Sequence, residues 1–379
     1  MITEKKYAIR PILESSKGIH LTAYLVNQGN WVDIRSQLRK SIARASEWLS
    51  KVQKPEETKR FLEPLSALLL ETKILKGLKG NIAIFRNQNF FRLINIPIEV
   101  QGGLHLASSF HVKPLLRWLQ GDKDFLLLGV DKGSAHLYAG SQFSLKLVDS
   151  ILFPEPFKEG DSLGDYASLK KSRLCLAKDS KSLAWISNWI AELTINSKPK
   201  LFLAGAPHHT QELHKNLFYE NMAQAPVAQS FGAEHLSTIC QNIREVLKEE
   251  ARKNFVQTLQ EFKIAEKGNR AKKNIFQIAK AVVRGKVRKL IVTDEVNIFG
   301  KIDTRSGGLS LHHTDLDHED DCILDDLAQM VLSQGGEVLI AKRSEIPTGH
   351  PILAILDDDS ERCEKAGAFA GEVAAMRIV

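Results

Sequence analysis

Histidines and carboxylates crowd one short stretch of the chain, between His312 and Asp321. The stretch reads HHTDLDHEDD, so that His312, His313 and His318 stand among aspartates and a glutamate. Imidazole nitrogens and carboxylate oxygens are ligands of zinc and of other divalent metals. Their spacing here fits no defined site, and acidic residues also suit the first turn of a following helix. The three histidines are therefore candidate metal ligands, and a solvated loop is the alternative.

A serine in a glycine-bounded pentapeptide is the second candidate for chemistry. Residues 160–164 read GDSLG, which fits the GxSxG pattern around the nucleophile of serine hydrolases. Ser162 would attack from a tight turn after a buried strand, with backbone amides as oxyanion hole and a histidine as base. The preceding residues, PEPFKE, do not form such a strand, which speaks against an esterase.

Signatures for a nucleotide or a cofactor are absent from the sequence. It has no GxGxxG after a strand and no GxxxxGK loop, so we expect no cofactor. Asp131 follows an apolar run, where a nuclease would keep one metal carboxylate, but no partners complete a two-metal site. The four cysteines lie far apart, which argues against a zinc ribbon and a disulfide scaffold: Cys175, Cys240, Cys322 and Cys363.

Positive charge is concentrated between Lys263 and Lys289. The whole chain has a net charge of +7 and a pI of about 9.0, so the excess is uneven. A basic stretch of this density attracts a phosphate backbone, and a solvated helix face is the alternative. We expect six of its cations to contact RNA phosphates: Lys272, Lys273, Arg284, Lys286, Arg288 and Lys289.

A second basic face is predicted near the N-terminus. Apolar residues at helical spacing predict an amphipathic helix over Val32–Val52. Its polar side could meet RNA, and an ordinary exposed helix face is the alternative reading. The cations on that side are Arg35, Arg39, Lys40 and Arg44.

Residues 1–122 are expected to form an α/β domain that positions this helix. Pro55 should open a second helix, which Pro64 should kink or restart. Two strand-like runs and a short joint then indicate a hairpin, and a short helix closes the domain. These elements are predicted over Ile82–Phe85, Phe90–Ile96 and Phe110–Leu119.

Residues 123–238 are expected to form a mixed sheet. Three apolar runs with short turns predict three antiparallel strands, and a fourth strand follows a helix over Leu183–Leu193. This order is that of a ribonuclease H-like sheet. Residues 153–180 form a long irregular loop, of a kind that is usually functional or disordered. The four strands are predicted over Phe125–Val130, Ala135–Ala139, Phe143–Ile151 and Leu201–Gly205.

Residues 239–379 are expected to form a layered α/β domain with a partly parallel sheet. A long helix over Glu234–Phe262, in one piece or two, leads into it. Two apolar runs, Leu290–Thr293 and Val338–Ala341, suit buried strands, and Gly335 ends the helix between them. The helices are predicted over Asn274–Arg284 and 323–331.

Length and composition indicate a globular protein of more than one domain. The chain has 379 residues, of which 43% are hydrophobic. No stretch reaches the about 18 apolar residues that a membrane span needs. The first residues also lack the apolar core of a secretory signal. We expect a cytoplasmic protein whose partners include neither a membrane nor DNA.

Several short blocks of the sequence occur together in one protein family. They are VRGKVRKLIV at 283–292, LDDLA at 324–328 and GGEV at 335–338, with AGAP at 204–207. On these residues the chain resembles the archaeo-eukaryotic peptide-release-factor and pelota group, and most closely its bacterial branch of release-factor-like proteins. Phe369–Arg377 is similar to the closing strand of that family, and Pro351–Leu356 competes for the role.

The resemblance implies three domains. They are an α/β N-terminal domain, a ribonuclease H-like middle domain and a C-terminal α/β sandwich of the ribosomal L7Ae/L30e type. It also implies binding in the ribosomal A site, with the middle domain reaching the peptidyl-transferase centre. The implied partners are the ribosome, through rRNA or tRNA, and a translational GTPase.

Release factors of this family carry a Gly-Gly-Gln loop that positions water against the peptidyl-tRNA ester. This sequence has no Gly-Gly-Gln, and QGG at 101–103 and 334–336 has the reverse order. The resemblance therefore implies a binder in termination, rescue or hibernation that does not hydrolyse by this device. Whether it is an enzyme stays open, and a divergent peptidyl-tRNA hydrolase or an esterase using Ser162 is the alternative. The loop residues expected to face the centre are Gly160, Asp161 and Gly164.

Overall fold

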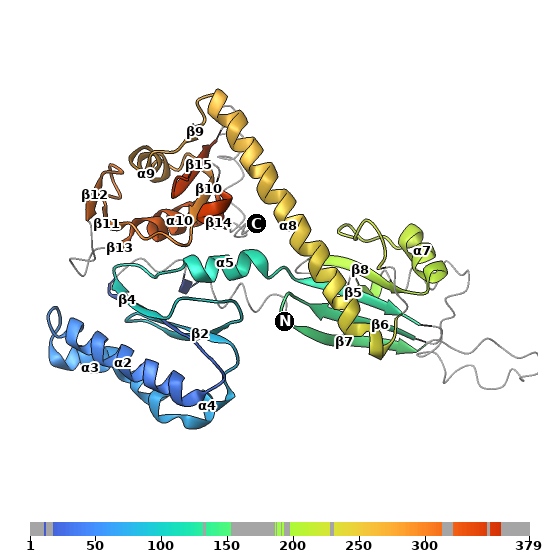
Figure 1. Ribbon diagram of the computed structural model, residues 1–379, viewed down its shortest axis with the longest axis horizontal. Helices are drawn as coiled ribbons and strands as arrows, with labels where there is room; N and C mark the ends of the chain where they lie inside the picture. Colours follow the sequence, from blue (N-terminus) through green and yellow to red (C-terminus); the bar gives the residue numbers. More distant parts are fainter. Residues whose placement is uncertain are drawn as a thin grey trace, which may run out of the picture. The chain divides into compact units, whose positions relative to one another are not determined.

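The protein is a mixed α/β structure, which confirms the predicted class (Figure 1). The computed structural model describes residues 11–12, 18–131, 134–152, 186, 188–190, 192, 198–227, 231–312, 321–346 and 349–357. The chain divides into two compact units. We call Met1–Tyr7 with Gly121–Lys253 the middle unit, and Ala8–Gln120 with Asn254–Val379 the terminal unit. None of the described helices combines the length and hydrophobicity that a membrane span requires.

The N-terminal part of the terminal unit contains an antiparallel sheet of order β3-β2-β1-β4. The predicted hairpin is confirmed as β2 and β3, and the Asn87 side chain closes its turn by accepting from the backbone N–H groups of Asn89 and Phe90. Two strands, β1 and β4, were not predicted, although β1 is fully buried. The strands span His20–Leu25 (β1), Asn81–Arg86 (β2), Phe91–Ile96 (β3) and Gly103–Ala107 (β4).

Three helices cover one face of this sheet: α2 (Trp31–Leu49), α3 (Pro55–Leu70) and α4 (Thr72–Gly77). Their leucines pack against the alternate side chains of β1 and β2 that point to this face, which makes one apolar core. The predicted helix α2 is confirmed, and the side chain of Asn30 caps it by accepting from the Val32 N–H.

Helix α3 is continuous through Pro64, which excludes the restart, one of the two predicted effects of this proline. A proline removes the N–H that would bond to the carbonyl four residues earlier, here that of Arg60. The guanidinium of Arg86 compensates from β2. It donates to the carbonyls of Phe61, at 2.9 Å, and Arg60, at 3.4 Å.

The other part of the terminal unit is an α/β sandwich. Its sheet has the order β14-β10-β15-β9, and β10 pairs parallel with β14 and antiparallel with β15. The partly parallel sheet is therefore confirmed. Pro351–Leu356 contains the strand β15, whereas Phe369–Arg377 lies outside the described residues. The strands span Ala271–Lys272 (β9), Val287–Thr293 (β10), Glu337–Ala341 (β14) and Ile352–Leu356 (β15).

Helices lie on both faces of that sheet. Helices α9 (Ile275–Val283) and α10 (Ile323–Ser333) pack on one face, and the second half of α8 packs on the other. Gly335, with φ of +81°, follows α10 as the predicted C-terminal glycine. The core beneath α9 and α10 continues into the N-terminal sheet through α5 (Lys113–Gly121).

A small sheet that was not predicted precedes α10. Its order is β12-β11-β13, and its strands are too short and too polar to show an apolar alternation. They span Phe299–Ile302 (β11), Leu309–His312 (β12) and Asp321–Cys322 (β13).

The middle unit contains a mixed sheet of order β7-β6-β5-β8. Its first three strands are antiparallel neighbours and β8 pairs parallel with β5, as the ribonuclease H-like order predicts. Parallel bridges from Leu201 to Met222 and from Ala204 to Val227 extend the sheet beyond β8. The elements span Phe125–Val130 (β5), Ser134–Gly140 (β6), Leu145–Leu152 (β7), Lys200–Gly205 (β8) and Pro207–Asn216 (α7).

Helix α8 runs unbroken from Leu236 to Lys267, so the predicted long helix is one helix. Ile239 and Ile243 belong to a core of the middle unit, and Phe262 belongs to a core of the terminal unit. Val246 is 46% exposed. Its neighbour Leu247 occupies the buried position instead.

Candidate nucleic-acid interface

Three of the six cations expected to meet RNA are ion-paired within the protein. Arg288 and Lys289 on β10 both reach the carboxylate of Glu261 on α8, and the Lys289 pair measures 3.0 Å. Lys289 also lies 3.4 Å from Glu337. Lys273 pairs with Glu266, at 2.5 Å. In the described structure these cations are already partly neutralised.

Glu261 is the centre of this ion-pair group. Burial on its own would raise the pKa of its carboxyl, but hydrogen bonds from Lys289 and Arg288 outweigh that effect and lower the pKa. Glu261 therefore stays negative and holds two cations against α8. The sequence prediction could not show this, because Glu261 precedes both partners by more than 25 residues.

The other three expected cations lie just before and just after α9. Lys272 is on the edge strand β9, and its Nζ donates to the Asn269 carbonyl at 3.4 Å. Arg284 is the exposed C-cap of α9, and Lys286 lies in the following turn. The structure thus gathers these three at the two ends of one short helix.

The exposed side of α9 contains two residues that the sequence analysis missed. Phe276 is 45% exposed, although the apolar side of the helix is already buried through Ile278 and Val282. Lys280 follows it at i+4 and is exposed. Arg284 follows at i+8, so the three share one helix face. That spacing was readable from the sequence.

The turn between β11 and β12 packs directly on α9. Gly307 has a φ of +72°, and a Cβ there would lie 2.6 Å from the Cα of Lys280. Only glycine allows so close an approach in this conformation. The exposed Arg305 lies in the same turn, two residues before Gly307.

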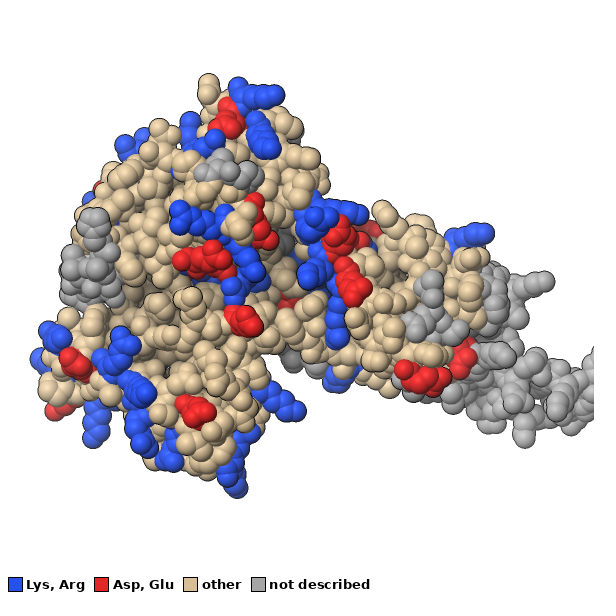
Figure 2. All heavy atoms as spheres, viewed as in Figure 1, with Lys and Arg blue, Asp and Glu red and all other residues tan. Residues whose placement is uncertain are grey.

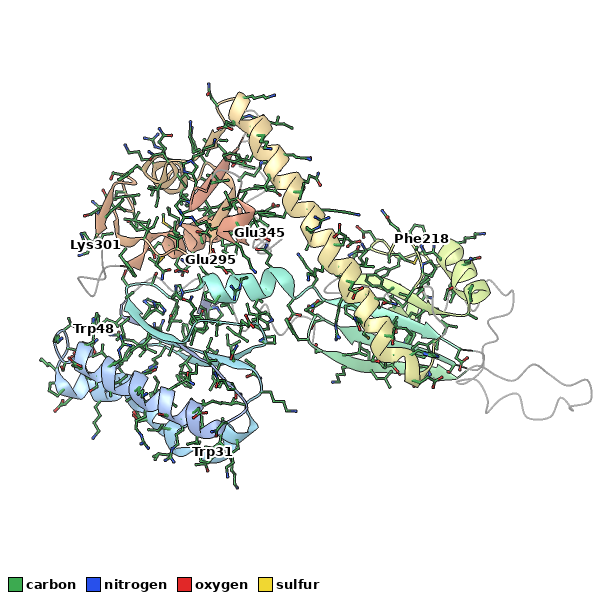
Figure 3. All side chains as sticks on the ribbon, in the orientation of Figure 1. Trp31, Trp48, Phe218, Glu295, Lys301 and Glu345 are labelled. Atoms are coloured by element: carbon green, nitrogen blue, oxygen red, sulfur yellow. The ribbon has the colours of Figure 1, made fainter. Side chains whose placement is uncertain are left out.

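Exposed cations also cover the outer side of α2, α3 and α4. Figure 2 shows lysine and arginine side chains gathered over these helices, with fewer acidic ones among them. Trp31 and Trp48 lie at the two ends of α2 (Figure 3), and the Lys76 Nζ lies 5.1 Å from the centre of the Trp31 ring. The exposed cations are Arg39, Lys40, Arg44, Lys51, Lys54, Lys59, Arg60, Lys73, Lys76 and Lys79.

The metal and hydrolase candidates fall mostly outside the described residues. His312 ends β12, and its Nε2 lies 3.4 Å from the hydroxyl of Ser310. Among the described residues no three His, Cys, Asp or Glu side chains are placed to hold a metal ion. The remaining candidates lie outside the described residues: His313, His318, Gly160, Asp161, Ser162 and Gly164.

A buried polar cluster, which the sequence did not predict, connects the two sheets of the terminal unit. Asp325 on α10 is 1% exposed, and its Oδ2 lies 2.6 Å from Nδ1 of His111. Its Oδ1 accepts the backbone N–H groups of Val112 and Lys113, at 2.9 and 2.8 Å. The Lys113 Nζ is fully buried and donates to the carbonyl of Val296 and the side chain of Asn297.

The electrostatics of this cluster keep Asp325 ionised. Burial would raise the pKa of Asp325, but the nearby His111 and Lys113 and the hydrogen bonds hold it well below its usual range. Burial and His111, whose ring stacks 4.2 Å away, lower the pKa of His105 to about 3. Burial raises the pKa of the Cys322 thiol to about 11, so it stays protonated.

The hydrogen bonds of the cluster indicate a structural role. A His–Asp pair can act as a general base in hydrolases. Here both oxygens of Asp325 are engaged, and Oδ1 caps the N-terminus of α5 from another helix. A small pocket opens beside it, lined in part by His105, Ser109 and Cys322. The cluster therefore holds the two sheets of the terminal unit together. The basic faces remain as the candidate nucleic-acid interface.

No protein-family model matches the chain, and no curated protein matches it. Among solved structures it is similar to the archaeal translation termination factor aRF1, with 13% identity over 94% of this chain and 98% of that one and a TM-score of 0.25. It is also similar to ribosome-bound archaeal Pelota, with 13% identity over 71% and 72% of the two chains and a TM-score of 0.41. It is similar as well to Dom34 of S. cerevisiae, a translation termination-like factor. Here the identity is 14% over 73% of each chain, and the TM-score is 0.41.

Proposed function

We propose that the chain is a ribosome-binding protein of the release-factor and pelota type, acting in translation termination, ribosome rescue or hibernation. It would bind without hydrolysis by a Gly-Gly-Gln loop. The proposal rests on the sequence blocks that resemble this family and on the basic faces of the terminal unit. It includes the division into domains 1–122, 123–238 and 239–379, the last of the L7Ae/L30e type, and a cytoplasmic location.

The observation that carries the proposal is the density of positive charge in one segment of the C-terminal sandwich. Residues 263–289 contain ten lysines and arginines and one acidic residue, Glu266. They form the end of α8, the strand β9, the helix α9 and the start of β10. A surface of this charge attracts a polyanion, and rRNA and tRNA are the polyanions that the family resemblance suggests. A translational GTPase is proposed as a further partner on the resemblance alone.

Co-sedimentation with ribosomal subunits tests this function. We expect the wild-type chain to sediment with subunits at low salt, and less as salt rises, because phosphate contacts release counterions. The triple variant K272E/R284E/K286E should lose most of the bound fraction. It leaves Arg288 and Lys289 in place, because reversing them would set two acids beside Glu261.

The matched control reverses three exposed lysines of the middle unit, Lys215, Lys248 and Lys253. It changes the net charge by the same amount and should sediment like wild type. Equal binding by all three proteins, or no binding by wild type, would reject the proposal.

The alternative function is hydrolysis by Ser162. The variant S162A, assayed on a simple ester and on peptidyl-tRNA beside wild type, separates it from binding alone. Turnover by wild type that S162A abolishes would favour the hydrolase. The absence of turnover with intact subunit binding would favour the proposed binder.

A further inference from the structure

We propose that the outer face of α9, together with the turn 303–308, binds single-stranded RNA. We call this surface, formed by Phe276, Lys280, Arg284 and Arg305, the α9 face. In it the ring of Phe276 stacks on an unpaired base, while Lys280 and Arg305 contact the phosphates on either side. The inference rests on the proposed function, since RNA is the partner proposed there, and it names the form of RNA and the residue that recognises it.

Phe276 has no packing role that explains it. The helix needs an apolar side for the core, and Ile278, Ala279 and Val282 supply that side. Phe276 lies off this stripe and is 45% exposed, in the first turn of a helix capped by Asn274. An exposed aromatic ring on a rigid helix is a platform on which any base can stack.

The cations that accompany Phe276 come from two elements. Lys280 follows it by one helical turn, and Arg305 lies in the turn 303–308, whose Gly307 packs on the helix backbone at Lys280. Because this contact is so close, the backbone of the turn that contains Arg305 is held against α9. A ring with cations from two sides matches the alternation of base and phosphate along a single strand.

Charge favours a nucleic acid over a protein as occupant. Three of the four residues of the α9 face lie within the segment 263–289, which contains ten cations and one acidic residue. Asp303, in the adjacent turn, uses its carboxylate to accept from the Arg305 N–H, at 3.0 Å, and from the Ser306 hydroxyl. A protein partner would have to be strongly acidic, and the test below includes that outcome.

The ring favours an unpaired strand over a duplex. Bases in a duplex are already stacked and do not offer a face to Phe276, whereas bases of loops and ends do. The two tryptophans on the other basic surface do not offer the same opportunity, because Lys76 lies over the ring of Trp31 and Trp48 is partly buried against the core beneath α2. The α9 face is therefore the described basic surface on which stacking is best supported.

The test measures binding of the full-length chain to a fluorescein-labelled 12-nucleotide oligouridine by fluorescence anisotropy. F276A removes the ring and keeps every charge, so we expect affinity to fall about ten-fold with the salt dependence unchanged. F276W should restore it. K280A/R305A should weaken binding and flatten the salt slope by about 0.7 for each phosphate that is no longer neutralised.

Phe218 supplies the matched control. It is 95% exposed in the middle unit, and Figure 3 labels it beside α7. F218A should bind oligouridine as wild type does. A second readout uses an oligonucleotide with one 2-aminopurine, whose fluorescence stacking quenches; F276A should lose that quenching. Thermal melts confirm that each variant is folded.

Several results would overturn the inference. They are wild-type affinity in F276A, equal losses in F276A and F218A, and no binding of oligouridine by wild type at low salt. Binding of an acidic protein segment such as polyglutamate with the same dependence on Phe276 would assign the face to a protein instead.

The outcome is separable from that of the proposed function. If wild type sediments with subunits and F276A binds oligouridine normally, the inference fails and the function stands. If oligouridine binding depends on Phe276 but the wild-type chain does not sediment with ribosomal subunits, the proposed function fails and the RNA site stands.

Discussion

The Nδ1 atom of His111 lies 2.6 Å from Oδ2 of Asp325, although the two residues are 214 positions apart in the sequence. The pair joins the loop before α5 to the first turn of α10. The second carboxylate oxygen caps α5. One buried side chain therefore connects the N-terminal and C-terminal parts of the terminal unit.

Replacing Asp325 by Asn should destabilise the terminal unit. The change removes the charge beside His111 and Lys113 and replaces one acceptor by a donor, and breaking a buried pair in this way costs about 3 kcal/mol. Denaturant unfolding measures the loss, and hydrogen exchange should show lower protection of the Val112 and Lys113 amides. The neighbouring D326N is the control and should cost about 1 kcal/mol or less, because Asp326 accepts a hydroxyl hydrogen bond from Ser109. Equal losses in the two variants would contradict the role given to Asp325.

The stability of the terminal unit should fall between pH 6.5 and pH 4.5. His105 has a pKa of about 3 in the folded chain, mainly because it is buried, whereas the pKa of a histidine in an unfolded chain is about 6.5. In this window the unfolded chain binds a proton that the folded chain does not. The free energy of unfolding therefore drops as pH falls, by up to about 1.4 kcal/mol per pH unit for each such group. His20, whose pKa burial also lowers, acts in the same direction.

The variant H105Q tests this dependence. It should show a shallower slope of unfolding free energy against pH than wild type. The exposed His350 gives the control, and H350Q should keep the wild-type slope. Below about pH 4 the lowered pKa of Asp325 adds a further loss, as its carboxylate takes up a proton in the unfolded chain first. Identical slopes in wild type and H105Q would show that His105 does not contribute to the pH dependence of stability.

Arg86 and Pro64 should be energetically coupled. The guanidinium donates to the carbonyl of Arg60, which lacks its usual helical donor because residue 64 is proline. R86M should lower the unfolding free energy by about 1–2 kcal/mol, since it removes charged donors from Phe61 and Arg60. In a P64A background, where an N–H reaches Arg60, the same change should cost at least about 0.5 kcal/mol less. A double-mutant cycle measures the difference, and strict additivity would refute the coupling.

Neutralising Glu261 should strengthen RNA binding. Its carboxylate holds Arg288 and Lys289, so E261Q would release Arg288 toward an external phosphate and leave Lys289 paired with Glu337 alone. We expect oligouridine affinity at low salt to rise several-fold, with a steeper salt dependence. E245Q, on the exposed side of α8 in the middle unit, makes the same change in net charge and should have little effect. A loss of affinity in E261Q would show that the ion pairs are needed to position the cations.

Much of the fold was predictable because its pattern is local. Helices α2 and α8 and the strand β10 carry apolar residues at the spacing of their own structure. The strand β1 was missed because His20 and Thr22 interrupt its apolar run, and both are buried. The Thr22 hydroxyl accepts from the N–H of His111, 89 residues away. No local pattern could reveal that partner.

The candidate interface was predictable in charge and not in detail. The density of cations marks the basic segment in the sequence. Which of them pair with a carboxylate depends on Glu261 and Glu337, which lie on other elements. The packing on α9 of the turn that contains Arg305 depends on Gly307. By contrast, Phe276 and Lys280 could have been identified from their spacing of four residues.

One consequence follows from the unbroken course of α8. Starting a helix is unfavourable and extending it is not, because the first turn fixes several residues for a single hydrogen bond. In α8 that initial step is shared, since Ile239 and Phe262 anchor the same helix in different cores. Whichever core forms first lowers the barrier for the other half of the helix. A glycine pair at the centre of α8 would divide it into two segments that must each nucleate, so the two units would melt more independently.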